Sequence, residues 1–190
     1  MSEVDALTLL TRGGRPITIR TGCPDDARLV LDFAQEVLDG SDWSVLQPHE
    51  LPDVEGQRAW LESFLSRVGA LILVVQTEGQ VVGLLSFENG NRDRIAHEGH
   101  FGMSLLEAWR GQGIGRALLG RLLDWAESSE IIEKVRLEVF ADNQRAYALY
   151  ESMGFVEEGR FLRGQKMAEG VYVDSIAMYK FTGGSSAGTT

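Results

Sequence analysis

The sequence has a single cysteine, four prolines and few basic side chains for its 190 residues. The lone thiol, Cys23, cannot form an intramolecular disulfide or build a zinc site by itself, so the expected location is cytoplasmic. Eighteen Lys and Arg against 28 Asp and Glu give a net charge of −10. This charge argues against a nucleic-acid partner, because a phosphate backbone would be repelled.

Long hydrophobic runs are also missing. The longest aliphatic run, residues 70–75, is far shorter than the roughly 20 residues of a membrane helix, and Glu3 and Asp5 stand where a signal peptide would be basic. We therefore expect no membrane partner. The content of 44% hydrophobic and 24% charged residues is that of a globular protein.

Periodicity predicts one folded domain with two ends outside it. We expect an N-terminal arm at 1–15, a domain at 16–182 and a flexible tail at 183–190. Apolar alternation predicts strands at 17–20, 70–75, 81–87, 96–106, 135–140, 155–156 and 171–181. Helical spacing predicts helices at 27–38, 60–68, 114–127 and 142–153. The fold class is therefore α+β, a mixed sheet with helices packed on it.

A glycine-rich turn at 104–116 joins a predicted strand to a predicted helix. Gly111, Gly113 and Gly115 allow positive φ and close approach, so that successive N–H groups can converge on a phosphate or pyrophosphate. Arg110 and Arg116 add positive charge. The alternative is that the glycines only tighten the turn. No Gly-Lys-Ser/Thr ends the turn, and the Gly-x-Gly-x-x-Gly pattern fails, which argues against a Walker loop and a nicotinamide enzyme.

This turn resembles a signature of the GNAT superfamily of acetyl-coenzyme A-dependent N-acetyltransferases. The family pattern Gln/Arg-x-x-Gly-x-Gly/Ala is met by Arg110, Gly113 and Gly115. Residues 137–155 are similar to a second signature, in which Asn, Ala, Leu-Tyr and Gly-Phe recur. The resemblance implies a mostly antiparallel sheet of about seven strands with four helices, splayed between its fourth and fifth strands, where acetyl-coenzyme A binds. It also allows a homodimer.

The resemblance implies a set of site residues. The implied cofactor-binding residues are Leu105, Leu106, Arg110, Gly111, Gln112, Gly113, Ile114, Gly115, Arg116, Asn143 and Tyr150. A main-chain N–H of Leu105 or Leu106 would polarise the thioester carbonyl, and Tyr150 would be the general acid. The alternatives are a helix N-cap for Asn143 and a packed core aromatic for Tyr150.

The general base stays open between two residues. Glu98 and His100 lie two apart on a predicted strand and so share a face. Glu98 and Trp43 are also candidate substrate residues. Trp43 lies in the expected loop 39–55, which has several acidic residues and no Lys or Arg and would attract an amine or a basic peptide. His97 and His100 would point to opposite faces, so no metal site is expected.

The expected function is transfer of the acetyl group from acetyl-coenzyme A to the primary amine of a small molecule, such as an amino acid or a polyamine, by direct attack. Residues 170–179 and 155–159 resemble the subgroup that acetylates free amino acids or other small amines. The alternatives are a protein N-terminal acetyltransferase of the ribosomal-protein type and a non-catalytic acyl-coenzyme A sensor.

Overall fold

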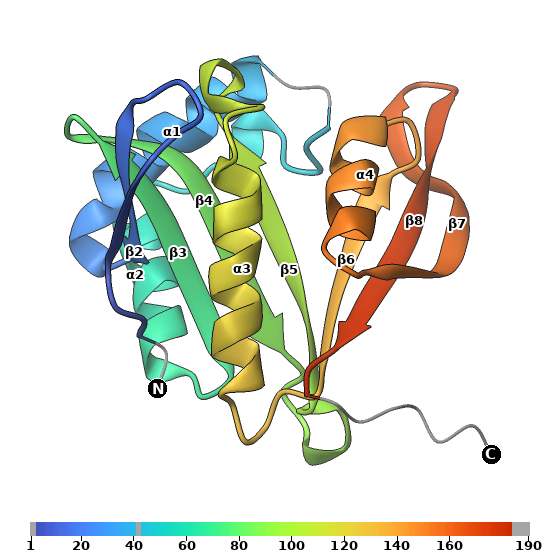
Figure 1. Cartoon of the computed structure of the whole chain (residues 1–190). Helices are drawn as coiled ribbons and strands as arrows, with labels where there is room; N and C mark the ends of the chain where they lie inside the picture. The colour runs from blue at the N-terminus through green and yellow to red at the C-terminus, as the bar shows by residue number, and fades with distance from the viewer. Residues whose placement is uncertain (1–2, 41–42, 184–190) are drawn as a thin grey trace. The chain divides into compact units, whose positions relative to one another are not determined.

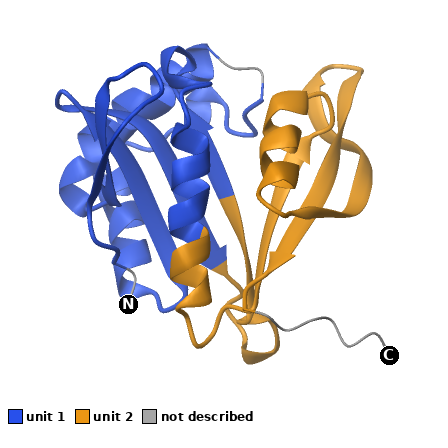
Figure 2. Ribbon diagram, in the orientation of Figure 1, with its two compact units in different colours: residues 1–88, 102–122 blue, residues 89–101, 123–190 orange. Residues whose placement is uncertain are grey.

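The computed structural model describes residues 3–40 and 43–183. The chain divides into two compact units (Figure 2). Unit 1 contains Met1–Glu88 and Gly102–Leu122, and unit 2 contains Asn89–Phe101 and Leu123–Thr190. None of the described helices is long and apolar enough to cross a membrane.

Unit 1 is built on antiparallel strands. These are β1 (Leu7–Leu10), β2 (Pro16–Thr21), β3 (Ala70–Thr77) and nearly all of β4 (Gln80–Asn89). Almost every residue of β3 is buried, which explains its continuous apolar run. Glu78 and Gly79 between β3 and β4 have φ of 48° and 79°, as a two-residue hairpin requires. The strands predicted at 70–75 and 81–87 thus form an antiparallel hairpin.

Helices cover both faces of these strands. α1 (Ala27–Asp39) and α2 (Val54–Ser66) pack together on one face, and α3 (Ile114–Glu127) lies on the other (Figure 1). α1 buries its predicted apolar stripe, including Val30 and Phe33. The apolar pattern that predicted α2 starts at residue 60, but the helix itself begins at Val54. The Asp53 side chain caps this earlier start, because it accepts a hydrogen bond from the Gly56 N–H at 2.8 Å.

Unit 2 contains three antiparallel strands and a helix. β6 (Lys134–Phe140) pairs with β8 (Val171–Phe181), and β8 pairs with the edge strand β7 (Val156–Ala168). α4 (Gln144–Ser152) connects β6 to β7. It ends at Ser152, one residue before the predicted end, and Gly154 follows with a φ of 87°, which suits a glycine after a helix.

β7 is much longer than the two residues that the sequence predicted. Its pairing with β8 shifts register between Glu157 and Gly159, between Phe161 and Gln165, and again near the end of the strand. Arg163 has a φ of 55°, and its N–H donates to the Asp174 carboxylate at 2.7 Å. Most of β7 is exposed. Because these irregularities remove the alternation of buried and exposed positions, the sequence carries no period-two pattern there.

β5 (Glu98–Leu105) belongs to both units and is hydrogen-bonded to β4. The strand order is β1-β2-β3-β4-β5-β6-β8-β7, a mixed sheet as predicted. β5 and β6 are parallel, and their ladder runs from Glu98 with Lys134 to His100 with Arg136. The ladder ends there, although both strands continue.

The expectation that residues 1–15 lie outside the fold is wrong for Leu7–Leu10. This segment forms β1 and pairs with β2 from Leu7 opposite Ile19 to Leu10 opposite Pro16. The sheet therefore has eight strands, one more than expected. Three of the four β1 residues are exposed, so no buried face imposes apolar alternation on the sequence. In the expected tail, residues 184–190 lie outside the described residues, and the domain boundaries stay a prediction.

An ion pair joins β2 to the turn that precedes α1. The Arg20 guanidinium donates two hydrogen bonds to the Asp26 carboxylate, at 2.6 and 2.7 Å, and the Cys23 N–H donates a third at 2.9 Å. The Asp26 side chain is only 6% exposed. Burial alone would raise the pKa of Asp26, but the hydrogen bonds from Arg20 and Cys23 outweigh it and lower the pKa.

We expect Asp26→Asn to lower the free energy of unfolding at pH 7 by about 3 kcal/mol, because Arg20 loses its charged partner. The folded-state pKa of Asp26 is lowered, so this stabilisation is present above about pH 4 and is lost as the pH falls further. Urea unfolding at pH 7 and pH 3 should show a smaller difference at pH 3, and an equal difference at both would contradict it. Asp25→Asn is the matched control, since Asp25 is 91% exposed and should cost under about 1 kcal/mol.

Candidate functional site

The glycine turn follows β5 in unit 1. A short 3-10 helix, Glu107–Trp109, leads into the glycines, and α3 begins at Ile114. Gly111 and Gly113 have φ of 77° and 92°. The expected positive φ is thus present at these two positions and not at Gly115, which is buried in the first turn of α3. A side chain with Cβ would strain the backbone at Gly111 or Gly113.

The main chain of this turn offers donors to a ligand. Among the described residues, the N–H groups of residues 111–115 donate no hydrogen bond to another part of the chain. They stand at the N-terminus of α3, where the helix dipole favours negative charge. This is the arrangement in which main-chain donors bind a phosphate.

Two long side chains of the turn bond to its own carbonyls. Arg110 Nε donates to the Leu105 carbonyl at 3.1 Å, and Gln112 Nε2 donates to the Ala108 carbonyl at 2.9 Å. Gln112 Oε1 is buried and has no partner among the described residues. Arg116 is exposed in the first turn of α3. Arg110 and Gln112 therefore shape the turn as well as adding polarity to it.

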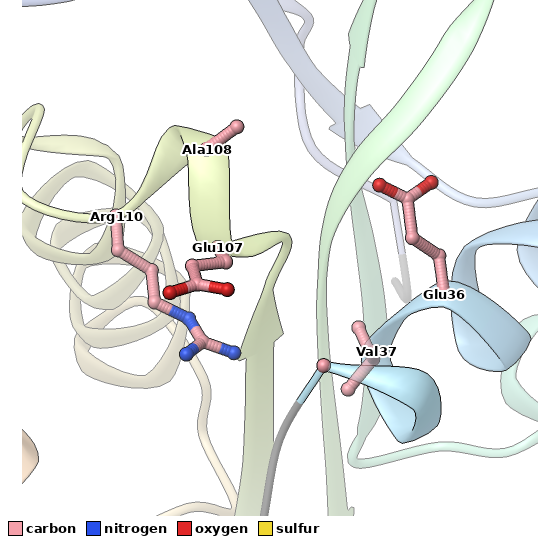
Figure 3. Close-up of a pocket in the computed structure, with 6 residues that line it drawn as sticks. Glu36, Val37, Glu107, Ala108 and Arg110 are labelled. Carbon is pink, nitrogen blue, oxygen red and sulfur yellow. The ribbon is translucent and has the colours of Figure 1, made fainter.

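A cavity of about 410 Å³ adjoins the turn within unit 1 (Figure 3). Its lining comes from the end of α1 and from the start of the turn, namely Glu36, Val37, Gly40, Glu107, Ala108 and Arg110. Figure 3 shows Glu36 on one side, with Glu107 and Arg110 across from it. The cavity thus has carboxylates on both walls and a guanidinium on one.

In unit 2, α4 carries the second predicted set. Asn143 is the N-cap, and its side-chain oxygen accepts a hydrogen bond from the Ala146 N–H at 3.1 Å. The Tyr150 ring is 6% exposed and lies edge-on to Phe101 and Phe155, with ring centroids 5.8 and 6.1 Å away. Burial raises the pKa of Tyr150 to about 12. No described residue hydrogen-bonds the Tyr150 hydroxyl.

Glu98 lies in a cluster of alternating charges in unit 2. Its carboxylate is 3.4 Å from Arg136 Nη1 and 3.8 Å from Lys134 Nζ. Glu158 pairs with the same two cations, and the hydrogen bond from Lys134 holds the pKa of Glu158 below its usual value. His100, two residues along β5, is exposed and has no polar partner among the residues that the structure describes.

The remaining candidates are Trp43 and Cys23. Trp43 is 44% exposed in the segment between α1 and α2. Cys23 is a half-buried free thiol. Within residues 3–40 and 43–183, no group of three or more His, Cys, Asp and Glu is placed to hold a metal ion.

Sequence reasoning missed two basic residues beside the turn. Arg15 Nη2 donates to the Ala108 carbonyl at 3.0 Å, and the Arg15 guanidinium carbon lies 3.5 Å from the centroid of the Trp109 ring. Arg12 lies beside Gly113. The Arg15 contact joins residues 93 apart in the chain, so no local pattern could have revealed it.

Comparisons with known proteins agree with this geometry. The model of the acetyltransferase (GNAT) family matches residues 36–155. L-amino acid N-acetyltransferase AaaT of Escherichia coli (strain K12) is 32% identical over 121 residues, which are 63% of this chain and 73% of that protein. The chain belongs to the acetyltransferase (GNAT) family.

Two solved structures resemble this acetyltransferase over most of its chain. A GNAT-family acetyltransferase from Streptococcus pneumoniae has a TM-score of 0.84 and 28% identity, and the match covers 87% of this chain and 99% of that one. A ribosomal-protein-alanine N-acetyltransferase from Brucella melitensis has a TM-score of 0.74 and 27% identity, and the match covers 86% and 98%. The predicted family and fold class are confirmed.

Acetyl-coenzyme A is the acetyl donor of this acetyltransferase, as the sequence predicted. The glycine turn fits its anionic phosphates, because left-handed Gly111 and Gly113 expose main-chain donors at the start of α3. Residues 111–115 would hold the pyrophosphate through their N–H groups. Arg116 would add positive charge at the same helix turn.

At the end of β5, the N–H groups of Leu105 and Leu106 differ in whether they are free to bind a ligand. The Leu106 N–H donates to the Val82 carbonyl of β4 at 3.1 Å and is therefore occupied. Successive N–H groups of a strand point to opposite edges, so the Leu105 N–H points away from β4. This leaves Leu105 as the better candidate donor to a thioester carbonyl.

Proposed function

We propose that this acetyltransferase acetylates the primary amine of a small molecule, with free amino acids as the leading class. The observation that carries the proposal is the cavity in unit 1, where Glu36 and Glu107 stand with Arg110. Carboxylates attract an ammonium group and a guanidinium attracts a carboxylate, so this lining suits a zwitterion. Likeness to an L-amino acid N-acetyltransferase supports the same class.

Acetylation of protein N-termini is the second candidate. It is supported by the likeness to a ribosomal-protein-alanine N-acetyltransferase. A peptide N-terminus would also meet the carboxylates of Glu36 and Glu107. It lacks a carboxylate next to the amine, however, so Arg110 would have no matching charge.

The proposed chemistry is direct attack by the amine, with no acyl-enzyme. Acetyl-coenzyme A supplies the acetyl thioester. The Leu105 N–H would donate to the carbonyl oxygen, where negative charge develops. Tyr150 would donate a proton to the departing thiolate. Burial raises the pKa of Tyr150 to about 12, so the placement of its hydroxyl, and not its acidity, would make it the donor. Asn143 would bond the cofactor through the part of its amide that does not cap α4.

His100 is the better candidate for the base. Protonation of Glu98 would weaken its ion pairs with Arg136 and Lys134. The His100 ring, in contrast, makes no hydrogen bond or ion pair with a described residue. The role of Glu98 would then be to stabilise the pairing of β5 with β6 through its ion pairs. Trp43 stays a proposed substrate contact.

The acceptor class is tested with matched amines. Release of coenzyme A should be fastest with a free amino acid, slower with its amide, and slowest with a short peptide of the same N-terminal residue. The amide keeps the amine and removes the carboxylate that Arg110 would bind. A peptide faster than the free amino acid would favour the second candidate, and donor binding with no release for any amine would favour a sensor.

Tyr150→Phe should lower kcat about a hundredfold and change the affinity for acetyl-coenzyme A by less than twofold. The melting temperature should stay unchanged, because the hydroxyl makes no hydrogen bond with a described residue. Steady-state kinetics, calorimetry and thermal melting measure these three quantities. Tyr172→Phe, at a 44% exposed tyrosine of β8, is the matched control. Equal losses of kcat and donor affinity would remove the general-acid role.

The base is tested with two neutral isosteres on one strand face. His100→Gln should lower kcat at pH 7 about a hundredfold at saturating donor, whereas Glu98→Gln should lower it less than threefold. The Glu98 variant should instead lose a little stability, because two cations lose a partner. The reverse order of the two kcat values would assign the base to Glu98.

A further inference from the structure

The turn between β1 and β2 lies against the glycine turn. Both belong to unit 1, and in Figure 1 the blue β1–β2 turn lies at the same end of this unit as the N-terminus of α3. The Arg12 N–H donates to the Gln112 carbonyl at 3.1 Å. A Cβ on Gly13 would lie 3.1 Å from Gln112 Oε1, so the two turns are in close contact.

The β1–β2 turn is ordered by its own hydrogen bonds. The Thr11 N–H donates to the Arg15 carbonyl and the Gly14 N–H to the Thr11 carbonyl, both at 2.9 Å. The Thr11 hydroxyl, which is buried, accepts from the Arg15 N–H at 3.2 Å. Gly14 has a φ of 77°, which closes the turn. The backbone that carries Arg12 and Arg15 is therefore held in place by hydrogen bonds of the turn.

Both arginines carry uncompensated charge beside the phosphate donors. Neither Arg12 nor Arg15 forms an ion pair with a described carboxylate, although the chain has a net charge of −10. The Arg12 side chain passes about 4 Å from the position of a Cβ on Gly113, with its Cγ at 3.9 Å and its Nε at 4.0 Å. Gly113 is one of the left-handed residues whose neighbours present free N–H groups.

We propose that Arg12 is a further phosphate-binding residue for coenzyme A and that Arg15 is a positioning residue for the glycine turn. Arg12 would add a guanidinium to the main-chain donors of residues 111–115. Arg15 would hold Ala108 and Trp109 in place through its hydrogen bond and its stacking on the ring. The inference depends on coenzyme A as the donor and is independent of the acceptor amine.

The test of Arg12 is calorimetric titration with coenzyme A and with 3′-dephospho-coenzyme A. Arg12→Ala should weaken binding of coenzyme A about tenfold, and Arg12→Lys should recover part of the loss. A loss confined to coenzyme A would identify the 3′-phosphate as the partner, and equal losses would identify the pyrophosphate. Folding should be unaffected, because the Arg12 side chain is exposed and its bond to Gln112 comes from the main chain.

Arg28→Ala is the matched control, since it removes the same charge from a 73% exposed position on α1. Its affinity for coenzyme A should stay within twofold of the parent protein. Arg12→Ala binding both nucleotides as the parent does would overturn the proposal for Arg12. An equal loss in Arg28→Ala would overturn it too, because only long-range charge would then be at work.

The test of Arg15 uses Arg15→Lys, which keeps the charge and loses the planar stacking. It should weaken coenzyme A and 3′-dephospho-coenzyme A by the same factor, about threefold, and change the tryptophan emission. The emission change should vanish in a Trp109→Phe background. Unchanged affinity, or an emission change that persists without Trp109, would overturn the positioning role. Because no acceptor amine is present, a failure here is separate from a failure of the proposed acceptor class.

Discussion

The cofactor end of this acetyltransferase depends on a backbone that leaves its N–H groups uncovered at the start of α3. Left-handed φ at Gly111 and Gly113 makes this possible, and any side chain there would strain the turn. Such a backbone has few contacts of its own. It needs neighbours that hold it without occupying its donors, and the carbonyls of Leu105, Ala108 and Gln112 provide the attachment points.

Two other candidate residues also make bonds that stabilise the fold. Asn143 uses its side-chain oxygen to begin α4, and Glu98 uses its carboxylate to join cations of β6. Each is therefore a structural residue as well as a candidate for chemistry. Tyr150 differs, because its ring is packed among aromatic rings while its hydroxyl has no partner in the described chain. A hydroxyl that the described chain leaves without a partner can bond to a bound cofactor, which favours a role in the reaction.

Two acidic residues of this acidic chain line the cavity of unit 1. Glu36 and Glu107 bring carboxylates from distant parts of the sequence to one volume, with Arg110 beside them. The acidic residues of 39–55 suggested an amine acceptor from composition alone. The lining of the cavity combines both charge signs, and under the proposed function it would favour a zwitterion over a peptide N-terminus.

The sequence by itself determined the family, the donor and most of the elements, because glycine spacing and apolar periodicity are local properties of the chain. It could not reveal β1, whose residues are mostly exposed, or the length of β7, where register shifts remove the alternation. Only the tertiary structure decided that the Leu106 N–H donates to the Val82 carbonyl and that the Glu98 carboxylate pairs with Arg136. It also decided that Arg12 and Arg15 lie at the glycine turn. These are contacts between residues far apart in the chain, and their partners become neighbours only when the strands and turns pack together.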